Sequence, residues 1–145
     1  VSIDAGDHSD IHPANKQVVG FRLCKEAGRL CYGRNEISAG PHFKSMAVRD
    51  GKAVLSFGNT GGGLTARGNA DGRLNGFAVA GKDGRFVRAD AVIDGDKVVA
   101  GSPEVREPAA VRYGWSDYAG DLNFYNQEGF PAVPFRTDVP DYIGG

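Results

Sequence analysis

The sequence predicts an α+β chain in which a strand, a polar loop and one helix precede an antiparallel β-sandwich. Apolar residues recur with helical spacing between Ala14 and Tyr32. After Ile37 the pattern changes to short apolar runs separated by four Asp-Gly pairs, which are typical of tight turns between strands. Glycine supplies 22 of the 145 residues, about twice the usual ~7%. We therefore expect one unit over residues 1–36 and a β-sandwich over residues 37–145.

The first twelve residues are expected to form a short strand followed by the polar loop Gly6–His12. Pro13 stands where the helix should start, because proline is tolerated at the first helical position. Gly33 is a plausible residue to end that helix. One helical face is apolar, and we expect it to be buried on the sandwich, on a neighbouring chain or on the remainder of a larger domain. This apolar stripe consists of Val19, Leu23, Ala27 and Leu30.

The second unit contains six strand candidates, and each Asp-Gly pair suits a hairpin turn. The strand candidates are Phe43–Arg49, Ala53–Phe57, Gly76–Ala80, Arg85–Ile93, Lys97–Ala100 and Ala109–Tyr113. The turn pairs are Asp50-Gly51, Asp71-Gly72, Asp83-Gly84 and Asp94-Gly95. Asn59–Gly63 is interpreted as a mobile loop. The tail, residues 117–145, mixes prolines with aromatic residues, which indicates irregular chain pinned onto another surface.

The charge balance excludes several classes of partner. Lysine and arginine number 17 against 18 acidic residues, a formal net charge of -1. This interspersed, near-neutral balance argues against a nucleic-acid partner or a membrane surface. No apolar run approaches the roughly 18–20 residues that span a bilayer. The chain begins at Val1 rather than Met, and we expect a fragment or a processed subunit.

Cys24 and Cys31 are seven residues apart. On one helix their α-carbons would be roughly 10 Å apart, whereas a disulfide tolerates at most about 7 Å. We therefore expect two free thiols, buried as small apolar groups.

The residues best suited to catalysis lie in the first polar loop. His8 and His12 stand there among the carboxylates Asp4, Asp7 and Asp10. A carboxylate and a histidine form two-thirds of a hydrolase triad, because the carboxylate fixes the imidazole tautomer and stabilises the imidazolium. The same residues could instead cap the helix, or supply nitrogen and oxygen ligands to zinc.

A second candidate site consists of aromatic residues near the C-terminus. Aromatic faces stack on sugar rings, so a carbohydrate-binding surface is one interpretation. The other is that these rings fill the core of the sandwich. The residues are Tyr113, Trp115, Tyr118 and Tyr125.

An ordered series of short segments runs over nearly the whole chain. It begins with Asp10–Gln17 and includes Val19-Gly20, Arg22-Leu23, Gly76-Phe77, Ala80-Gly81, Asp83-Gly84, Phe86, Ala110–Trp115, Asn123–Asn126, Gly129–Ala132 and Pro134–Asp138. This series resembles the sialate O-acetylesterase family, whose members are serine esterases of the SGNH-hydrolase type. The resemblance implies removal of O-acetyl groups from sialic acid or a similar sugar, without metal or organic cofactor. It also implies a periplasmic or secreted location.

The resemblance makes His12 the general base of the triad. Enzymes of this type usually place the triad acid three residues before the histidine, and that position is Ser9 here. Asp10, two residues before, is the nearest substitute and our candidate. Asp7 is another, and the acid could also lie upstream of this sequence.

The nucleophile that the family requires is missing from this chain. Its serine stands in a Gly-Gln-Ser or Gly-Asp-Ser block, and none of the seven serines of this chain does: Ser2, Ser9, Ser38, Ser45, Ser56, Ser102 and Ser116. The oxyanion-hole blocks are missing too, and acyl transfer needs both parts. We therefore expect the end of an α/β SGNH domain followed by the sandwich, inactive without an N-terminal chain or segment that carries the serine. The alternative is a non-catalytic β-sandwich that binds glycan or serves as an interaction and stabilising module.

Overall fold

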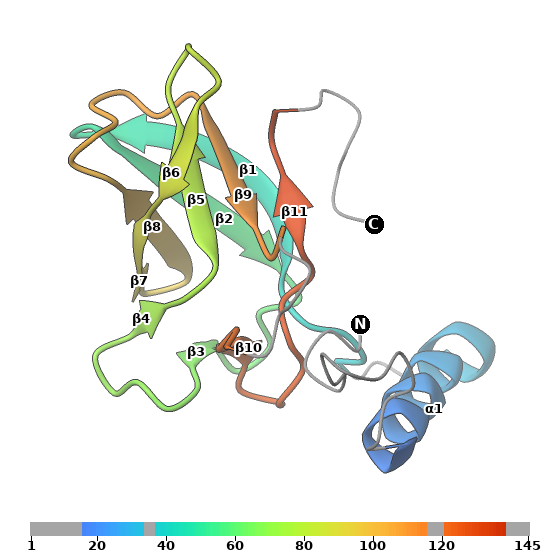
Figure 1. Cartoon of the computed structure of the whole chain (residues 1–145). Coiled ribbons are helices and arrows are strands. Elements are labelled where there is room, and N and C mark those ends of the chain that lie inside the picture. The colour runs from blue at the N-terminus through green and yellow to red at the C-terminus, as the bar shows by residue number, and fades with distance from the viewer. Residues whose placement is uncertain (1–15, 34–36, 116–120, 139–145) are drawn as a thin grey trace.

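The computed structural model describes residues 16–33, 37–115 and 121–138, and these form a mostly antiparallel β structure with one helix (Figure 1). This confirms the α+β class. No helix in these ranges is long and apolar enough to cross a membrane. The helix is α1 (Lys16–Tyr32), and the strands are β1 (His42–Arg49), β2 (Lys52–Gly58), β3 (Leu64–Ala66), β4 (Arg73–Leu74), β5 (Phe77–Ala80), β6 (Phe86–Arg88), β7 (Asp90–Asp94), β8 (Lys97–Gly101), β9 (Ala110–Tyr113), β10 (Phe124–Asn126) and β11 (Phe135–Arg136).

The larger sheet has the order β1-β2-β8-β7-β4, and all its pairs are antiparallel. Asp50 and Gly51 join β1 to β2 with φ of 51° and 72°, the left-handed pair that a two-residue type I′ turn requires. Between β7 and β8 the two loop residues are Gly95 and Asp96, because Asp94 already pairs with Lys97. Two of the predicted turn pairs thus join neighbouring strands of one sheet.

A second sheet has the order β11-β9-β5-β6. The predicted single strand Arg85–Ile93 is in fact two strands, because the chain passes from this sheet to the larger one at Ala89. The Ala89 N–H donates to the Phe77 carbonyl at 3.0 Å, which anchors the crossing point. A strand that switches sheets in this way builds a corner between two packed sheets.

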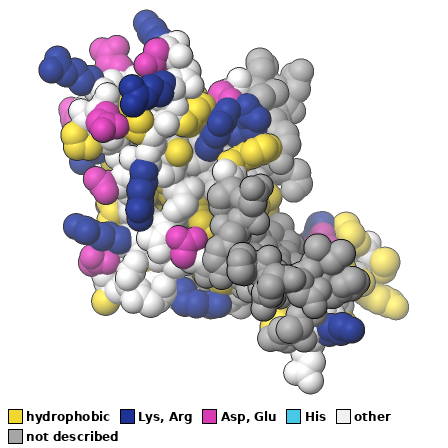
Figure 2. Space-filling view, in the orientation of Figure 1, with side chains coloured by type: hydrophobic (Ala, Val, Ile, Leu, Met, Phe, Trp, Pro, Cys, Tyr) yellow, Lys and Arg dark blue, Asp and Glu magenta, His cyan; other side chains and the backbone are white. Residues whose placement is uncertain are grey.

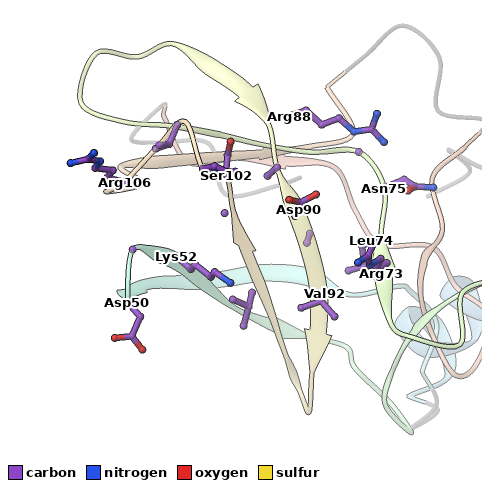
Figure 3. A pocket seen from close by; sticks show the side chains of 18 residues that line it. Asp50, Lys52, Arg73, Leu74, Asn75, Arg88, Asp90, Val92, Ser102 and Arg106 are labelled. Atoms are coloured by element: carbon purple, nitrogen blue, oxygen red, sulfur yellow. The ribbon is translucent and has the colours of Figure 1, made fainter.

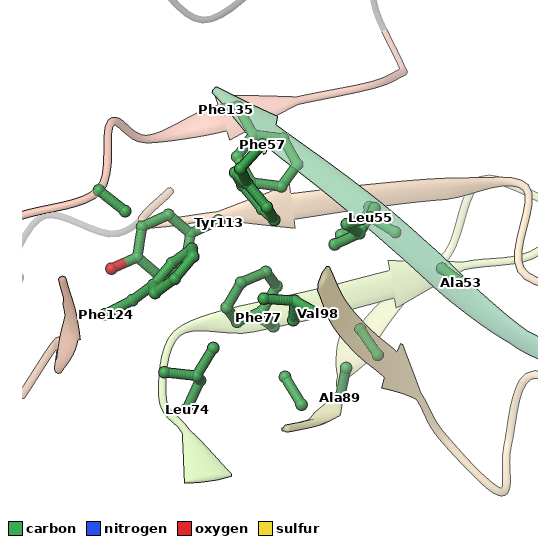
Figure 4. Packing of buried hydrophobic residues seen from close by; sticks show 14 of the residues in the cluster. Ala53, Leu55, Phe57, Leu74, Phe77, Ala89, Val98, Tyr113, Phe124 and Phe135 are labelled. Atoms are coloured by element: carbon green, nitrogen blue, oxygen red, sulfur yellow. The ribbon is translucent and has the colours of Figure 1, made fainter. Parts of the chain in front are cut away.

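Both sheets contribute to one hydrophobic core, an arrangement that fits a β-sandwich (Figure 4). Leu55 and Val98 come from the larger sheet, and Phe77 comes from the smaller one. The tail supplies Phe124 and Phe135, both fully buried. The prediction that the tail is pinned onto another surface is therefore confirmed.

Asn126 connects three separated segments beneath this core. Its side-chain amide donates to the carbonyls of Ala39 at 3.1 Å and Asn59 at 3.0 Å. Its carbonyl oxygen accepts from the Phe130 N–H at 2.9 Å. The segment that we interpreted as a mobile loop is further tied down where the Gly62 N–H donates to the Glu128 carboxylate at 2.8 Å.

Candidate functional site

The two predicted catalytic residues, His12 and Asp10, lie outside the described residues. So do His8, Asp7 and the strand expected at the N-terminus. What the structure does place is α1, which begins at Lys16, four residues after His12.

Helix α1 touches the β structure through a few contacts on one side. The Phe21 ring stacks on Phe130 with centroids 6.4 Å apart. The Glu26 carboxylate accepts hydrogen bonds from Arg29, at 2.7 Å, and from the Ser38 hydroxyl. These two donors hold the pKa of the Glu26 carboxyl below its usual value. The link from Glu26 to Ser38 joins the helix to the start of the second unit.

The apolar stripe of α1 faces away from the β structure. Leu23 and Leu30 are each 66% exposed, whereas the buried helix residues are Arg22 and Gly28. Hydrophobic side chains accordingly project from the surface at the α1 end of the molecule (Figure 2). We expected one of three surfaces to cover the stripe. The exposure of Leu23 and Leu30 excludes one of them, the sandwich of this chain, for these two leucines.

The expectation of buried thiols is wrong for this chain. Cys24 and Cys31 are both free, as predicted, and both are exposed. The reason is geometric, because at 100° per residue each thiol lies a quarter-turn or more around the helix from the leucine that precedes it, on a side that the β structure also leaves uncovered.

The candidate aromatic residues divide into two groups. Tyr113 and Tyr125 are 1% and 4% exposed and fill the core, as the second interpretation held. Trp115 is 48% exposed. Tyr118 lies outside the described residues.

A cluster that sequence reasoning did not assemble lies beside Trp115. Arg112 on β9 and Arg136 on β11 are direct register partners, and like charges placed so are destabilising. Asp138 compensates for both. Its two oxygens accept from Arg112 Nε at 3.2 Å and Nη2 at 2.6 Å, and from Arg136 Nε at 2.9 Å and Nη2. These bonds hold the pKa of the Asp138 carboxyl far below its usual range.

Each arginine of this cluster also packs on an aromatic ring. The Arg112 guanidinium lies 3.9 Å from the centre of the Phe86 ring, and the Arg136 guanidinium lies 4.8 Å from that of Trp115. Such contacts are attractive, because the face of an aromatic ring is electronegative. One part of this cluster could have been found in the sequence. Arg136 and Asp138 are two residues apart, and residues two apart in a strand share a face.

A hollow of about 870 Å³ lies over the outer side of the larger sheet (Figure 3). The stem of Lys52 lies over Gly101, so closely that a Cβ there would contact its Cγ at 3.0 Å. Val92 forms part of the floor, while Arg88 and Arg106 stand at opposite ends and point outward. Among the described residues, no three His, Cys, Asp or Glu side chains gather as metal ligands would.

Comparison with solved structures finds a close match to this chain. No family model matches the chain, and no curated protein sequence matches it. Among solved structures, the chain is similar to a carbohydrate acetylesterase from Xanthomonas citri, with 46% sequence identity and a TM-score of 0.88. The similarity covers 94% of this chain and 31% of that enzyme, so the chain spans about a third of its length. The likeness supports a relationship with carbohydrate esterases.

Proposed function

We propose that the chain is the histidine-bearing, C-terminal part of a carbohydrate O-acetylesterase that acts on a sialic acid-type sugar. The observation that carries the proposal is the 46% identity to a carbohydrate acetylesterase over 94% of the chain. In this assignment residues 1–36 are the end of an SGNH-hydrolase domain and residues 37–145 are a β-sandwich. The intact protein would act in the periplasm or outside the cell.

In the proposed reaction His12 is the general base. It takes the proton of a serine hydroxyl, which lies on a part of the protein outside this chain, as the serine attacks the acetyl carbonyl carbon. It then returns that proton to the sugar oxygen as the acetyl–oxygen bond breaks. Water attacks the acetyl-serine with the same base and releases acetate. Asp10 would hold the tautomer of His12 that accepts the serine proton.

The exposed side of α1 supports the need for a second part. Leu23 and Leu30 would bury much of their side chains on contact with the serine-bearing part, at about 25 cal/mol per Å² of apolar area removed from water. In this proposal the serine-bearing part also covers the adjacent side of the helix, where Cys24 and Cys31 are exposed. A thiol reagent should therefore label both cysteines in the chain alone and much more slowly in the assembled protein.

The test is an acetyl-ester assay on this chain alone and on the same chain together with its serine-bearing part. We expect hydrolysis only in the second sample, and its loss on His12→Ala. His42→Ala is the matched control, because His42 is in β1, far along the chain from the loop. Parallel Asp10→Asn and Asp7→Asn variants identify the triad acid.

Full activity of the His12→Ala variant would overturn the proposal. Binding of glycans without hydrolysis in any combination would favour the alternative, a non-catalytic glycan-binding or interaction module.

A further inference from the structure

Trp115 is presented at the surface by the local backbone. Tyr113 ends β9 with its ring in the core, and Gly114 follows with φ of 69°. The Gly114 N–H donates to the Gly76 carbonyl at 3.1 Å. A residue with a side chain rarely adopts this φ, so glycine is what lets the chain turn here. The turn leaves the chain's single tryptophan 48% exposed directly after a rigid strand.

The arginines beside the ring are held in place before any ligand arrives. Arg136 is fixed from two directions, by the Asp138 carboxylate and by the indole ring 4.8 Å away. Arg112 is fixed by the same carboxylate and by Phe86. Side chains that are already ordered lose less entropy when they bind. Two guanidinium groups against one carboxylate also leave the cluster with one excess positive charge.

Arg112 retains hydrogen-bonding capacity. A guanidinium has five N–H donors, and Arg112 gives its Nε and Nη2 to Asp138. Within the described part of the chain its Nη1 makes no hydrogen bond. Its side chain is 31% exposed, so a ligand can reach it.

We propose that Trp115, Arg136 and Arg112 form a carbohydrate-binding subsite on the second unit of this chain. A pyranose ring would lie on the indole, where its C–H groups meet the negative face of the ring. Hydroxyl or carboxylate oxygens of the same glycan would accept hydrogen bonds from the guanidinium groups. The inference rests on the proposed function in that the glycan is the acetylated substrate, held in addition to the contacts at the catalytic loop.

A purely structural role accounts for part of the cluster only. Asp138 and the two arginines would lock β9 to β11 with or without tryptophan nearby. That role does not require a half-exposed indole at the end of β9. The hollow over the larger sheet is the weaker candidate for sugar binding, because none of the described residues that line it is aromatic.

The experiment uses the fluorescence of Trp115, which reports on this surface alone because the chain has one tryptophan. The assembled protein, with tryptophans of the serine-bearing part replaced by phenylalanine, is titrated with acetylated sialic acid and acetylated xylo-oligosaccharides. We expect a saturable change in emission and protection from acrylamide quenching. Sorbitol at the same concentrations is the control and should change neither.

Variants then separate binding from folding. Trp115→Ala should weaken glycan binding about tenfold, the loss of about 1.4 kcal/mol, while Trp115→Phe keeps a flat ring and most of the affinity. Arg112→Gln should weaken it as well, with Arg88→Gln as the control on β6. In turnover assays Trp115→Ala should raise the KM for an acetylated oligosaccharide, whereas Arg88→Gln should leave that KM unchanged.

Two outcomes would overturn the subsite: emission that does not respond to saturating glycan, or equal glycan affinity of Trp115→Ala and the parent protein. Either result can coexist with hydrolysis of p-nitrophenyl acetate, so the subsite can fail while the proposed function stands. A protein that binds glycan at Trp115 and hydrolyses no ester would fail the proposed function instead.

Discussion

Replacement of Asn126 by alanine should destabilise the protein by about 3 kcal/mol. The side chain is fully buried, and its amide and carbonyl satisfy the Ala39 carbonyl, the Asn59 carbonyl and the Phe130 N–H. These segments are far apart in the sequence, so the side chain connects the start of the second unit, the Asn59–Gly63 loop and the tail.

The magnitude follows from what the substitution leaves unpaired. A buried donor or acceptor that loses its partner costs about 1–3 kcal/mol. The Phe130 N–H is buried and should incur most of that cost, whereas the carbonyls of Ala39 and Asn59 lie at part-buried sites where water can replace some of the amide. The amide cavity adds to the loss.

The assay is urea unfolding of the protein. Asn69→Ala is the matched control: its amide donates to the Arg73 carbonyl at 3.0 Å, but in an exposed position, so the change should stay within about 0.5 kcal/mol. A loss below about 1 kcal/mol for Asn126→Ala would refute the reasoning.

Asn126→Asp tests whether two backbone carbonyl oxygens face this side chain. One carboxylate oxygen can still accept from Phe130, but the other faces the two carbonyl oxygens and raises the pKa of the new carboxyl in the folded state. A raised folded pKa means that the deficit grows as pH rises from about 4 towards 7. A deficit independent of pH would mean that the two carbonyl oxygens do not face this side chain.

Two further predictions concern other positions. Gly40→Ala should lower the free energy of unfolding by about 3 kcal/mol through overpacking, because a Cβ there would overlap the Pro131 carbonyl. Gly84→Ala is the control, since Gly84 lies in open space with φ of 74°. It should lower the free energy of unfolding by about 1–2 kcal/mol through backbone strain alone. Equal melting temperatures for these two variants would contradict this view. Asp138→Asn should lower the melting temperature at pH 7, because the depressed pKa of Asp138 stabilises the fold above the unfolded value of about 3.9 and that contribution is lost as pH falls. The melting temperatures of the parent protein and of the Asp138→Asn variant should therefore converge in acid.

Most of the strands that sequence reasoning identified are joined to a pairing partner by a short hairpin, whereas β9 pairs with the more distant β5 and β11. The turn pairs Asp50-Gly51 and Asp94-Gly95 lie at hairpins between β1 and β2 and between β7 and β8. Asp71-Gly72 misled us, because β4 beyond it pairs with β7 rather than with the preceding strand. Turn chemistry predicts that the chain reverses and leaves open which strand it then meets.

The short strands were missed because their partners are distant. Strands β3 and β10 have three residues each and pair across more than fifty positions, Leu64 with Asn126. No hydrophobic period can be read from three residues. In the segment Arg85–Ile93 the odd positions from Val87 to Ile93 are apolar. This alternation continues through Ala89 without a sign that the strand changes sheets.

The candidate site was predictable to a different degree in each part. His12 and Asp10 stay predictions. Strand alternation would place Trp115 on the same buried face as Tyr113. The structure exposes Trp115 instead, because Gly114 between them turns the chain. The contact between Arg112 and Asp138 depends on the pairing of β9 with β11. This pairing could not be predicted, because β11 has only two residues.

The orientation of α1 links these observations to function. Its periodicity was interpreted correctly as a helix with an apolar face. The opposite side of the helix, which carries Phe21, Arg22 and Gly28, is the one that packs on the β structure. The β structure has its own closed core and takes no residue of the stripe into it. An apolar face with two thiols that its own chain leaves exposed is the pattern of a helix shared between two bodies. In the proposed function, the second of these bodies is the serine-bearing part.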